Sequence, residues 1–245
     1  MLPQAEGPIK ADLVIFDFDG TLFDSYLSVI DSITRTFAAL LPSYTPPHTQ
    51  IEHIISTGGS AYDVFRALHP SPSSLDAGTE ELWVKTYRAL YDEYAQDLVK
   101  PYPGARELLY LLREDKVPIA IVSNKGVGAI RTALERNGFS GVIPDDLVVG
   151  DNTPGAGKKP DPASFVNVVV PRLKEMKGDN YCLDEKRVLV VGDTVADINF
   201  AKNINAMACW CRYGQGSKEE CEKLKPDAVV NSLEEVAGVL YTLGG

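Results

Sequence analysis

The sequence predicts an α/β fold in which a mostly parallel β-sheet carries an inserted helical domain. Short apolar runs alternate with helical patterns over most of the chain, and buried parallel strands are typically continuous apolar runs. One long interval, residues 25–99, shows helical patterns and no convincing strand. Polar and mostly acidic residues stand where the apolar runs end, and ligands of open α/β sheets bind at those strand ends.

Six apolar runs are predicted to form the sheet. In chain order they are Leu13–Asp19, Pro118–Asn124, Leu147–Gly150, Val188–Thr194, Met207–Tyr213 and Ala228–Asn231. Helical patterns follow three of them, at Gly126–Asn137, Asp161–Lys177 and Ala196–Asn203. This β-α-β alternation favours parallel strands joined by right-handed crossovers, which is a Rossmann-like core.

The interval after the first strand is too long for a simple crossover. Its helical stretches are Ser25–Leu41, one starting near Pro46–Pro47, Ala61–Leu68 and Glu80–Leu98. We therefore expect two domains: a catalytic core from residues 1–24 and 100–245, and a helical cap from residues 25–99. Within the cap, the glycine-containing loop Ser56–Tyr62 could be a lid element or a plain turn between helices.

Composition excludes some partners and compartments. With 24 lysines and arginines against 34 aspartates and glutamates, the net charge is −10, which argues against nucleic-acid binding. An anionic substrate therefore needs a local cation at its site. The four cysteines form no CxxC pair, so free thiols in a reducing compartment are expected. The first ten residues do not resemble a signal peptide, and no apolar run is long enough to span a membrane. We expect a cytoplasmic location and no membrane partner.

Two aspartates end the first predicted strand. Side chains two positions apart in a strand point the same way, so Asp17 and Asp19 should aim at one spot at the sheet edge. Gly20 permits a tight turn and Thr21 adds a hydroxyl. A capping turn, with Asp19 bonded to backbone amides, is the structural alternative. That alternative accounts for only one of the two acids.

Three later clusters stand at equivalent places. Ser123 and Asn124 end the second strand, where they are equally typical of a helix N-cap and of an anion site. Lys159, in "GAGKKPDP", is a candidate for the missing cation. Asp193 ends the fourth strand, and Asp197 follows at the start of a helix, where the helix dipole alone would favour an acid.

Together these clusters place several carboxylates at one edge of the sheet. Their mutual repulsion needs a cation, and a hard divalent ion with oxygen ligands fits, with Mg²⁺ as the expected type. Neighbouring strands lie ~4.8 Å apart. The first strand should therefore lie between the strands that end at Ser123 and Asp193, so that their ends meet.

In this order, "DFDGT", "SN", "KP" and "GDTVAD" resemble the motifs of the haloacid dehalogenase superfamily of phosphotransferases. "DFDGTLFDS" together with "SNK" and "KPDP" is most similar to its phosphoglycolate-phosphatase-like branch, which has a helical cap at the position of residues 25–99. The resemblance spans essentially the whole chain. One departure is Asn205, which stands where relatives usually have glycine and which suits a left-handed helix end.

The resemblance implies a Mg²⁺-dependent phosphatase that acts on a small phosphorylated metabolite. Asp17 would be the nucleophile that forms an aspartyl-phosphate, and Asp19 the general acid and base. Mg²⁺ would be held by Asp17, the backbone carbonyl of Asp19, and Asp193. Asp197 would support the site by orienting Lys159 or the metal's waters.

The resemblance also implies how the phosphoryl group is bound. Ser123 and Lys159 would hold its oxygens, with Thr21 and Asn124 completing the substrate-binding set. In the cap, Arg66, Lys85 and Arg88 are candidates for binding a substrate carboxylate such as that of phosphoglycolate.

Other functions are weighed against this one. A dehalogenase would not need Asp19 and Asp193. A phosphomutase similar to β-phosphoglucomutase would use the same core and is separated only weakly, by Thr21 after Gly20. A non-catalytic phosphate-binding module would not need both Asp17 and Asp19. The sequence does not indicate an oligomeric state.

Overall fold

In the computed structural model, which describes residues 9–178 and 180–242, six strands form one parallel sheet. The first eight residues, which bear on the signal-peptide prediction, lie outside the described part. The strand order is β5-β4-β1-β6-β7-β8. Their bounds are β1 Leu13–Phe16, β4 Ile119–Gly126, β5 Val148–Asp151, β6 Val188–Gly192, β7 Met207–Cys211 and β8 Ala228–Val230. The predicted α/β class is confirmed, and each expected apolar run contains or overlaps one of these strands.

The first strand lies at the centre of the sheet, as expected if the ends of the strands that carry the motifs are to meet. β1 pairs in parallel with β4 on one side and with β6 on the other. Its four residues, "LVIF", are all buried, because neighbouring strands and helices cover both of its faces. The strand is shorter than predicted. After Asp17, whose amide still donates to Val191, the chain turns tightly, with the amides of Leu22 and Phe23 donating to Phe18.

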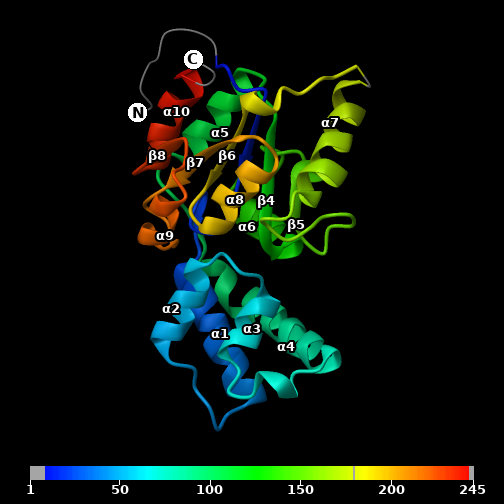
Figure 1. Cartoon of the computed structure of the whole chain (residues 1–245). Helices are drawn as coiled ribbons and strands as arrows, with labels where there is room; N and C mark the ends of the chain where they lie inside the picture. Colours follow the sequence, from blue (N-terminus) through cyan, green and yellow to red (C-terminus); the bar gives the residue numbers. More distant parts are fainter. Residues whose placement is uncertain (1–8, 179, 243–245) are drawn as a thin grey trace.

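Helices surround the sheet (Figure 1). They are α5 Ala105–Glu114, α6 Val127–Arg136, α7 Val170–Lys177, α8 Val195–Asn203, α9 Lys218–Lys223 and α10 Leu233–Thr242. A wide helical turn, Ser164–Val169, leads into α7, and short 3₁₀ turns stand at Asp145–Leu147 and Glu185–Arg187. After α8, Asn205 adopts a positive φ of 55°, which fits its expected left-handed conformation.

The second group of helices lies beyond the carboxyl ends of the strands (Figure 1). Its members are α1 Tyr26–Leu40, α2 His48–Ser56, α3 Ala61–Leu68 and α4 Ala77–Leu90, with turns at Pro72–Ser74, Tyr91–Ala95 and Gln96–Leu98. Two short antiparallel strands, β2 Phe23–Asp24 and β3 Lys100–Pro101, connect this group to the core. We call these helices the cap, and we propose that its bounds are those expected from the sequence, 25–99.

The cap has a hydrophobic cluster of its own. Phe37 packs edge-on against Trp83 at 4.8 Å between ring centroids, and Phe65 lies 5.3 Å from the same indole. Val84 and Ile33 are fully buried beside them. A larger cluster fills the core around the sheet and includes the second tryptophan, Trp210 of β7. The two tryptophans thus stand in separate hydrophobic clusters.

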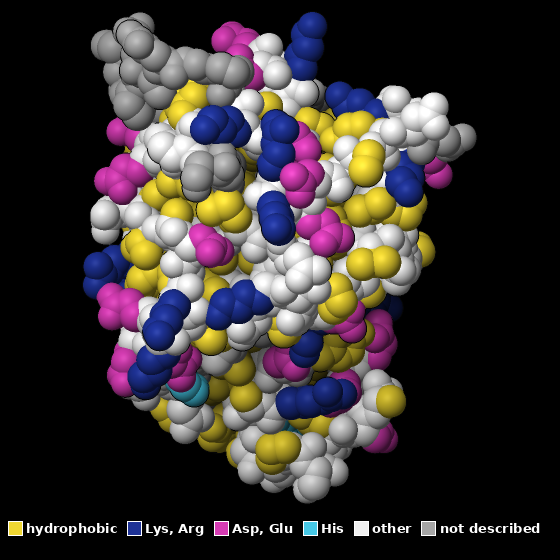
Figure 2. Space-filling view, turned by 45° about the horizontal axis from the view of Figure 1, so that its top comes forward, with side chains coloured by type: hydrophobic (Ala, Val, Ile, Leu, Met, Phe, Trp, Pro, Cys, Tyr) yellow, Lys and Arg dark blue, Asp and Glu magenta, His cyan; other side chains and the backbone are white. Residues whose placement is uncertain are grey.

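Lysine and arginine side chains are interspersed with aspartates and glutamates on the face shown in Figure 2. The four cysteines are free thiols, with Cys182 exposed and the other three buried. Across residues 9–178 and 180–242, no helix combines the length and the apolar character needed to cross a bilayer.

Candidate active site

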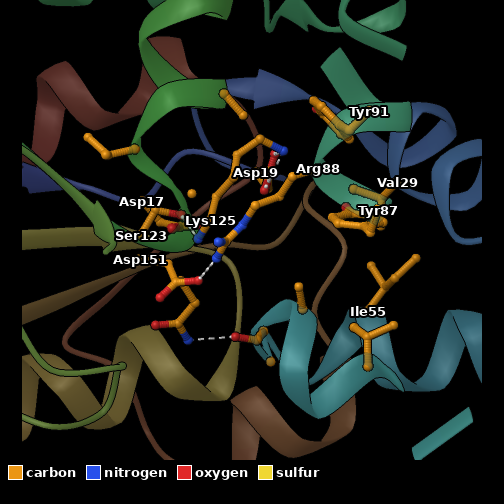
Figure 3. Close-up of a pocket in the computed structure, with 18 of the residues that line it drawn as sticks. Asp17, Asp19, Val29, Ile55, Tyr87, Arg88, Tyr91, Ser123, Lys125 and Asp151 are labelled. Atoms are coloured by element: carbon orange, nitrogen blue, oxygen red, sulfur yellow. Dashed lines mark hydrogen bonds and ion pairs between the residues drawn. The ribbon is translucent and has the colours of Figure 1, made fainter. Parts of the chain in front are cut away.

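A pocket of about 280 Å³ lies between the strand ends of the core and the cap (Figure 3). The core contributes Asp17, Asp19, Ser123 and Lys159 to its lining, and these come from three separate segments of the chain. The parallel sheet explains their meeting, because β1, β4 and β6 all end at this edge. The cap closes the opposite side with residues of α1 to α4.

Lys159 joins two of the predicted acids. Its ammonium Nζ lies 2.6 Å from Asp17 Oδ1 and 2.5 Å from Asp197 Oδ1, and all three side chains are nearly inaccessible to solvent. The other oxygen of Asp197, Oδ2, accepts the amide and hydroxyl of Thr194 at the start of α8. Asp197 therefore contacts Lys159 directly while it caps a helix.

Asp193 is fully buried, and donors surround its carboxylate. Oδ1 accepts the hydroxyl of Thr21 at 3.1 Å, and Oδ2 accepts the backbone amides of Gln215 at 2.6 Å and Gly216 at 3.2 Å. The chain comes so close at Gly20 that a Cβ atom there would lie 2.3 Å from Asp193 Oδ2. The loop after β7 was not anticipated as part of the site, because backbone amides leave no pattern in a sequence.

Thr21 differs from its expected role. It was assigned to substrate binding, but its side chain is fully buried, its hydroxyl is bonded to Asp193, and it does not line the pocket. The turn after β1 directs this hydroxyl beneath the acid cluster and away from the cavity. Thr21 thus orients Asp193 and does not face the cavity in which a substrate would bind.

The residues fit a divalent cation. One carboxylate oxygen each from Asp17, Asp193 and Asp197 lie within 4.8 Å of one another, all three on buried residues. An oxygen-only set of carboxylates is the type that Mg²⁺ prefers. The carboxylate of Asp19 is outside this group, so its candidate ligand is the backbone carbonyl that the family resemblance implies.

The buried charges perturb one another. Burial raises the pKa of Asp17 to about 6, against the attraction of Lys159 and with added repulsion from Asp197. Burial, and then repulsion from Asp197 and Asp17, also raises the pKa of Asp193 well above its usual range. For Lys159, burial works to lower the pKa, but the charges of Asp17 and Asp197 outweigh it, and the pKa is raised. The two carboxylates that Lys159 contacts therefore favour the charged form of this lysine.

Ser123 and Asn124 have different surroundings. Ser123 is buried at the pocket, where its hydroxyl oxygen accepts the amide of Lys125 at 3.3 Å. Asn124 uses its side-chain amide to join segments: Oδ1 accepts the amide of Lys159 at 2.8 Å, and Nδ2 donates to the carbonyl of Gly58 at 2.8 Å. Asn124 thereby fixes the lysine loop and holds the cap loop 56–62 over the core.

Lys125, which the sequence did not single out, pairs with Asp19. Its ammonium lies 3.0 Å from Asp19 Oδ1 and 3.2 Å from Oδ2. Burial works to lower the pKa of Lys125, yet the charge of Asp19 and the hydroxyls of Tyr91 and Tyr87 raise it overall. In the sequence, only its position directly after "SN" points to a place at the site. The pair itself leaves no local pattern, because Asp19 is 106 residues away.

Of the three cap cations considered, Arg88 alone lines this pocket. It extends from α4 across the cavity and pairs with Asp151 at the end of β5 (Figure 3). Arg66 pairs with Glu80 within the cap and lines a neighbouring cleft, and Lys85 is exposed. Tyr87 and Tyr91 of the same cap segment form an aromatic wall.

Comparison with known proteins agrees with this geometry. The family described as haloacid dehalogenase-like hydrolase matches residues 14–211. A phosphoglycolate phosphatase of Vibrio parahaemolyticus is 30% identical over 233 residues, covering 93% of this chain and 95% of the relative. The pyrophosphatase PpaX of Listeria welshimeri is 25% identical over 234 residues, covering 94% and 97%.

Solved structures share the fold. A crystal structure described as a predicted phosphoglycolate phosphatase from Haemophilus somnus superposes with a TM-score of 0.76 at 22% identity, covering 95% of this chain and 99% of that one. A haloacid dehalogenase-like family hydrolase from Streptococcus pneumoniae gives 0.74 at 20% identity, covering 94% and 98%. At this level of identity, the likeness concerns the fold.

Proposed function

The chain belongs to the haloacid dehalogenase-like hydrolase family and is a phosphatase, and from this premise we propose that it hydrolyses a small phosphate monoester with Mg²⁺ through an aspartyl-phosphate on Asp17. The observation that carries the proposal is the position of Asp17. Its carboxylate lines the pocket, 2.6 Å from a buried lysine and within 4.8 Å of two further aspartates. An acid kept among charges at the base of a cavity is typical of a nucleophile.

Magnesium would be held by Asp17, Asp193 and the backbone carbonyl of Asp19. When bound, it supplies positive charge that offsets the repulsion among the carboxylates and on the phosphoryl oxygens. The buried carboxylates of Asp17 and Asp193, which belong to one oxygen-only donor set, support their part in this assignment. Asp193 would keep its orientation through Thr21 and the amides of the loop after β7.

The chemical steps fall to two aspartates. A carboxylate oxygen of Asp17 forms a bond to phosphorus as the bond from phosphorus to the alcohol oxygen breaks. Asp19 gives its proton to the departing alcohol and then takes one from the water that hydrolyses the aspartyl-phosphate. Ser123 and Lys159 would hold the phosphoryl oxygens, where negative charge accumulates.

The leaving group is expected to be a small alcohol that carries an acid, as in phosphoglycolate. Arg88 supports this, because it faces the pocket from the cap and is the type of residue that binds a carboxylate. The relative named phosphoglycolate phosphatase also supports such a leaving group, and the relative named pyrophosphatase adds pyrophosphate to the compounds to be tested. The partner is thus a small phosphorylated metabolite, and a cytoplasmic location stays a prediction.

The test is phosphate release from a panel of phosphoglycolate, glycerol phosphates, sugar phosphates, nucleotides and pyrophosphate, with Mg²⁺ and with a chelator. We expect release from small acidic esters, abolished by the chelator and restored by Mg²⁺. Asp17→Asn should lose release from every compound and form no phosphorylated protein. Undiminished turnover of Asp17→Asn would overturn the proposed nucleophile.

A phosphomutase remains the alternative within the family. It would return the phosphoryl group to a second position of a sugar and would need a bisphosphate activator. Steady release of inorganic phosphate without such an activator favours hydrolysis, and transfer between sugar positions without net release would establish the mutase.

A further inference from the structure

A second buried lysine, Lys125, lies at the active site, and the proposed mechanism does not use it. The side chain of Lys125 is 7% exposed, and its ammonium lies within 3.2 Å of both oxygens of Asp19. A buried ammonium is costly unless it is paired, so its place beside a proposed catalytic acid needs an explanation.

The two lysines contact three of the four carboxylates, and they share none of them. Lys159 contacts Asp17 and Asp197, which belong to the group that can bind a metal. Among the acids that the structure describes, Lys125 forms an ion pair only with Asp19, whose carboxylate lies outside that group. In Figure 3, Asp19 is on the side of the pocket near Tyr91, whereas Asp17 lies beside Ser123. Lys125 thus contacts Asp19 on the side of the pocket that faces the cap.

The cap completes the surroundings of this ammonium. The Nζ atom of Lys125 lies 4.1 Å from the ring centre of Tyr91, a distance suited to a cation–π contact. The hydroxyl of Tyr91 is 3.0 Å from that of Ser28 in α1, so two cap segments fix the ring. On the core side, the ring of Phe18 lies 6.0 Å away. The ammonium is therefore enclosed between a core carboxylate and a cap aromatic ring.

We propose that Lys125 is a positioning residue for Asp19: it aims this carboxyl group at the leaving alcohol and stabilises the carboxylate that remains after the proton has been given up. In this step, the proton moves from Asp19 to the alcohol oxygen as its bond to phosphorus breaks, and Lys125 keeps its own protons. Tyr91 makes the arrangement depend on the cap's being in place. The inference rests on the proposed function, specifically on Asp19 as the general acid.

The test compares leaving groups. An alkoxide must be protonated as it departs, whereas p-nitrophenolate leaves without a proton, so only alkyl esters depend strongly on the acid. The ratio kcat/KM is the proper measure, because it includes no step after release of the alcohol. General acids contribute roughly 10²–10⁴-fold. We expect Lys125→Met to lower kcat/KM for alkyl phosphates by about 100-fold and for p-nitrophenyl phosphate by less than about fivefold, with Lys125→Arg recovering part of the alkyl activity.

Lys158→Met is the matched control. Lys158 is also a lysine that joins core to cap, through Asp63 at 2.7 Å, but it has no contact with Asp19. Its loss should change both kinds of ester equally. Tyr91→Leu, like Lys125→Met, should lower kcat/KM for alkyl phosphates more than for p-nitrophenyl phosphate. Tyr91→Phe, which keeps the ring, should not change this ratio.

Equal losses for alkyl and aryl esters in Lys125→Met, with a thermal unfolding midpoint like that of wild type, would overturn the positioning role. Partial recovery in Lys125→Arg keeps the test decisive if the methionine variant folds poorly. Failure of the proposed function looks different, since the wild-type protein would then release phosphate from neither kind of ester.

Discussion

Charge is unevenly balanced among the residues at the base of the pocket. Four carboxylates meet two ammonium groups there: Asp17, Asp19, Asp193 and Asp197 against Lys125 and Lys159. Counted as ionised, they sum to −4 + 2 = −2, the charge that one divalent cation cancels. Burial, and after it the repulsion from neighbouring acids, raises the pKa values of Asp17 and Asp193.

Magnesium binding should therefore stabilise the folded chain. At a hundredfold excess over Kd, a ligand adds about 2.7 kcal/mol, which corresponds to a rise in Tm of about 5–10 °C for a chain of this size. We expect Asp193→Asn to abolish most of this rise, measured by calorimetry with Mg²⁺ against a chelator. Asp151→Asn, in the same pocket but outside the acid cluster, should keep it. A full rise in Asp193→Asn would contradict the metal assignment.

Arg88 should set the preference for acidic leaving groups. Its pairing with Asp151 uses part of the guanidinium, and further N–H groups remain for a substrate carboxylate. A charge-assisted hydrogen bond contributes about 1.5–3 kcal/mol, or about 10–100-fold. We expect Arg88→Gln to lower kcat/KM for phosphoglycolate by that factor and to spare 2-hydroxyethyl phosphate, which has a similar size and no carboxylate.

Arg66→Gln is the control for this effect. Arg66 also forms a cap ion pair, with Glu80, but does not line the pocket. Its replacement should leave the ratio between the two substrates unchanged. If Arg88→Gln also leaves the ratio unchanged, the cap does not recognise a carboxylate through this residue.

Among the elements, α3 depends on one carboxylate at its start. Asp63 accepts the amide and hydroxyl of Ser60, and Ser60 accepts the amide of Asp63 in return, which forms a capping box. Lys158 of the core adds an ion pair to the same acid. Burial opposes ionisation of Asp63, but the hydrogen bonds from Lys158 and Ser60 prevail, and the pKa is lowered.

This shift predicts how stability depends on pH. Because the pKa of Asp63 is lower in the folded than in the unfolded chain, its contribution is fully present above the ordinary value of 3.8 and is lost as pH falls through the lowered value. We expect Asp63→Asn to lower the free energy of unfolding at pH 6 to 7, and the difference from wild type to shrink in acid. Urea titrations at several pH values measure it. A difference that does not vary with pH would assign the effect to packing.

The elements also show what a sequence can reveal. The strands were predictable because each is a short apolar run, and the carboxylates because they end such runs. The helix α5 was not predicted, although Leu108, Leu109 and Leu112 give it a buried face that could have indicated it. The antiparallel strands β2 and β3 have two residues each, too few to show a period, and their paired residues lie 76 (Asp24 and Lys100) and 78 (Phe23 and Pro101) positions apart.

Side-chain partners were the least predictable feature of the site. Lys125 and Arg88 join residues 106 and 63 positions away, and no local pattern encodes such a pair. The direction of the Thr21 hydroxyl depends on the turn after β1 and on the buried position of Asp193. The sequence therefore predicts that the acids and Lys159 gather at the strand ends, whereas the fold is needed to show which lysine contacts Asp17, Asp19 and Asp197.

At the scale of the whole molecule, the two hydrophobic clusters should respond separately to mutation. Phe37 is buried in the cap beside Trp83, while Trp210 lies in the sheet. Truncation of a buried phenylalanine costs about 3–5 kcal/mol. Each tryptophan can be observed alone, Trp83 in a Trp210→Phe background and Trp210 in a Trp83→Phe background. When Phe37→Ala is added to each, we expect the fluorescence of Trp83 to report unfolding at a lower urea concentration than the fluorescence of Trp210.

The reciprocal variant completes this experiment. Leu189→Ala, in the middle of β6, should lower the midpoint seen by Trp210 at least as much as the one seen by Trp83. Identical midpoints for both reporters in every variant would mean that residues 25–99 and the core unfold as one unit, and the proposed domain bounds would then mark no energetic division.

The short antiparallel pair of β2 and β3 has a consequence for how such a protein can evolve. Asp24 and Lys100 are paired across it, so everything between them departs from and rejoins the sheet-bearing part at neighbouring points. Paired Cα atoms of antiparallel strands are roughly 5 Å apart. A different insert whose ends meet at that spacing could be exchanged by recombination, giving a new chemical preference while the reacting acids stay where they are.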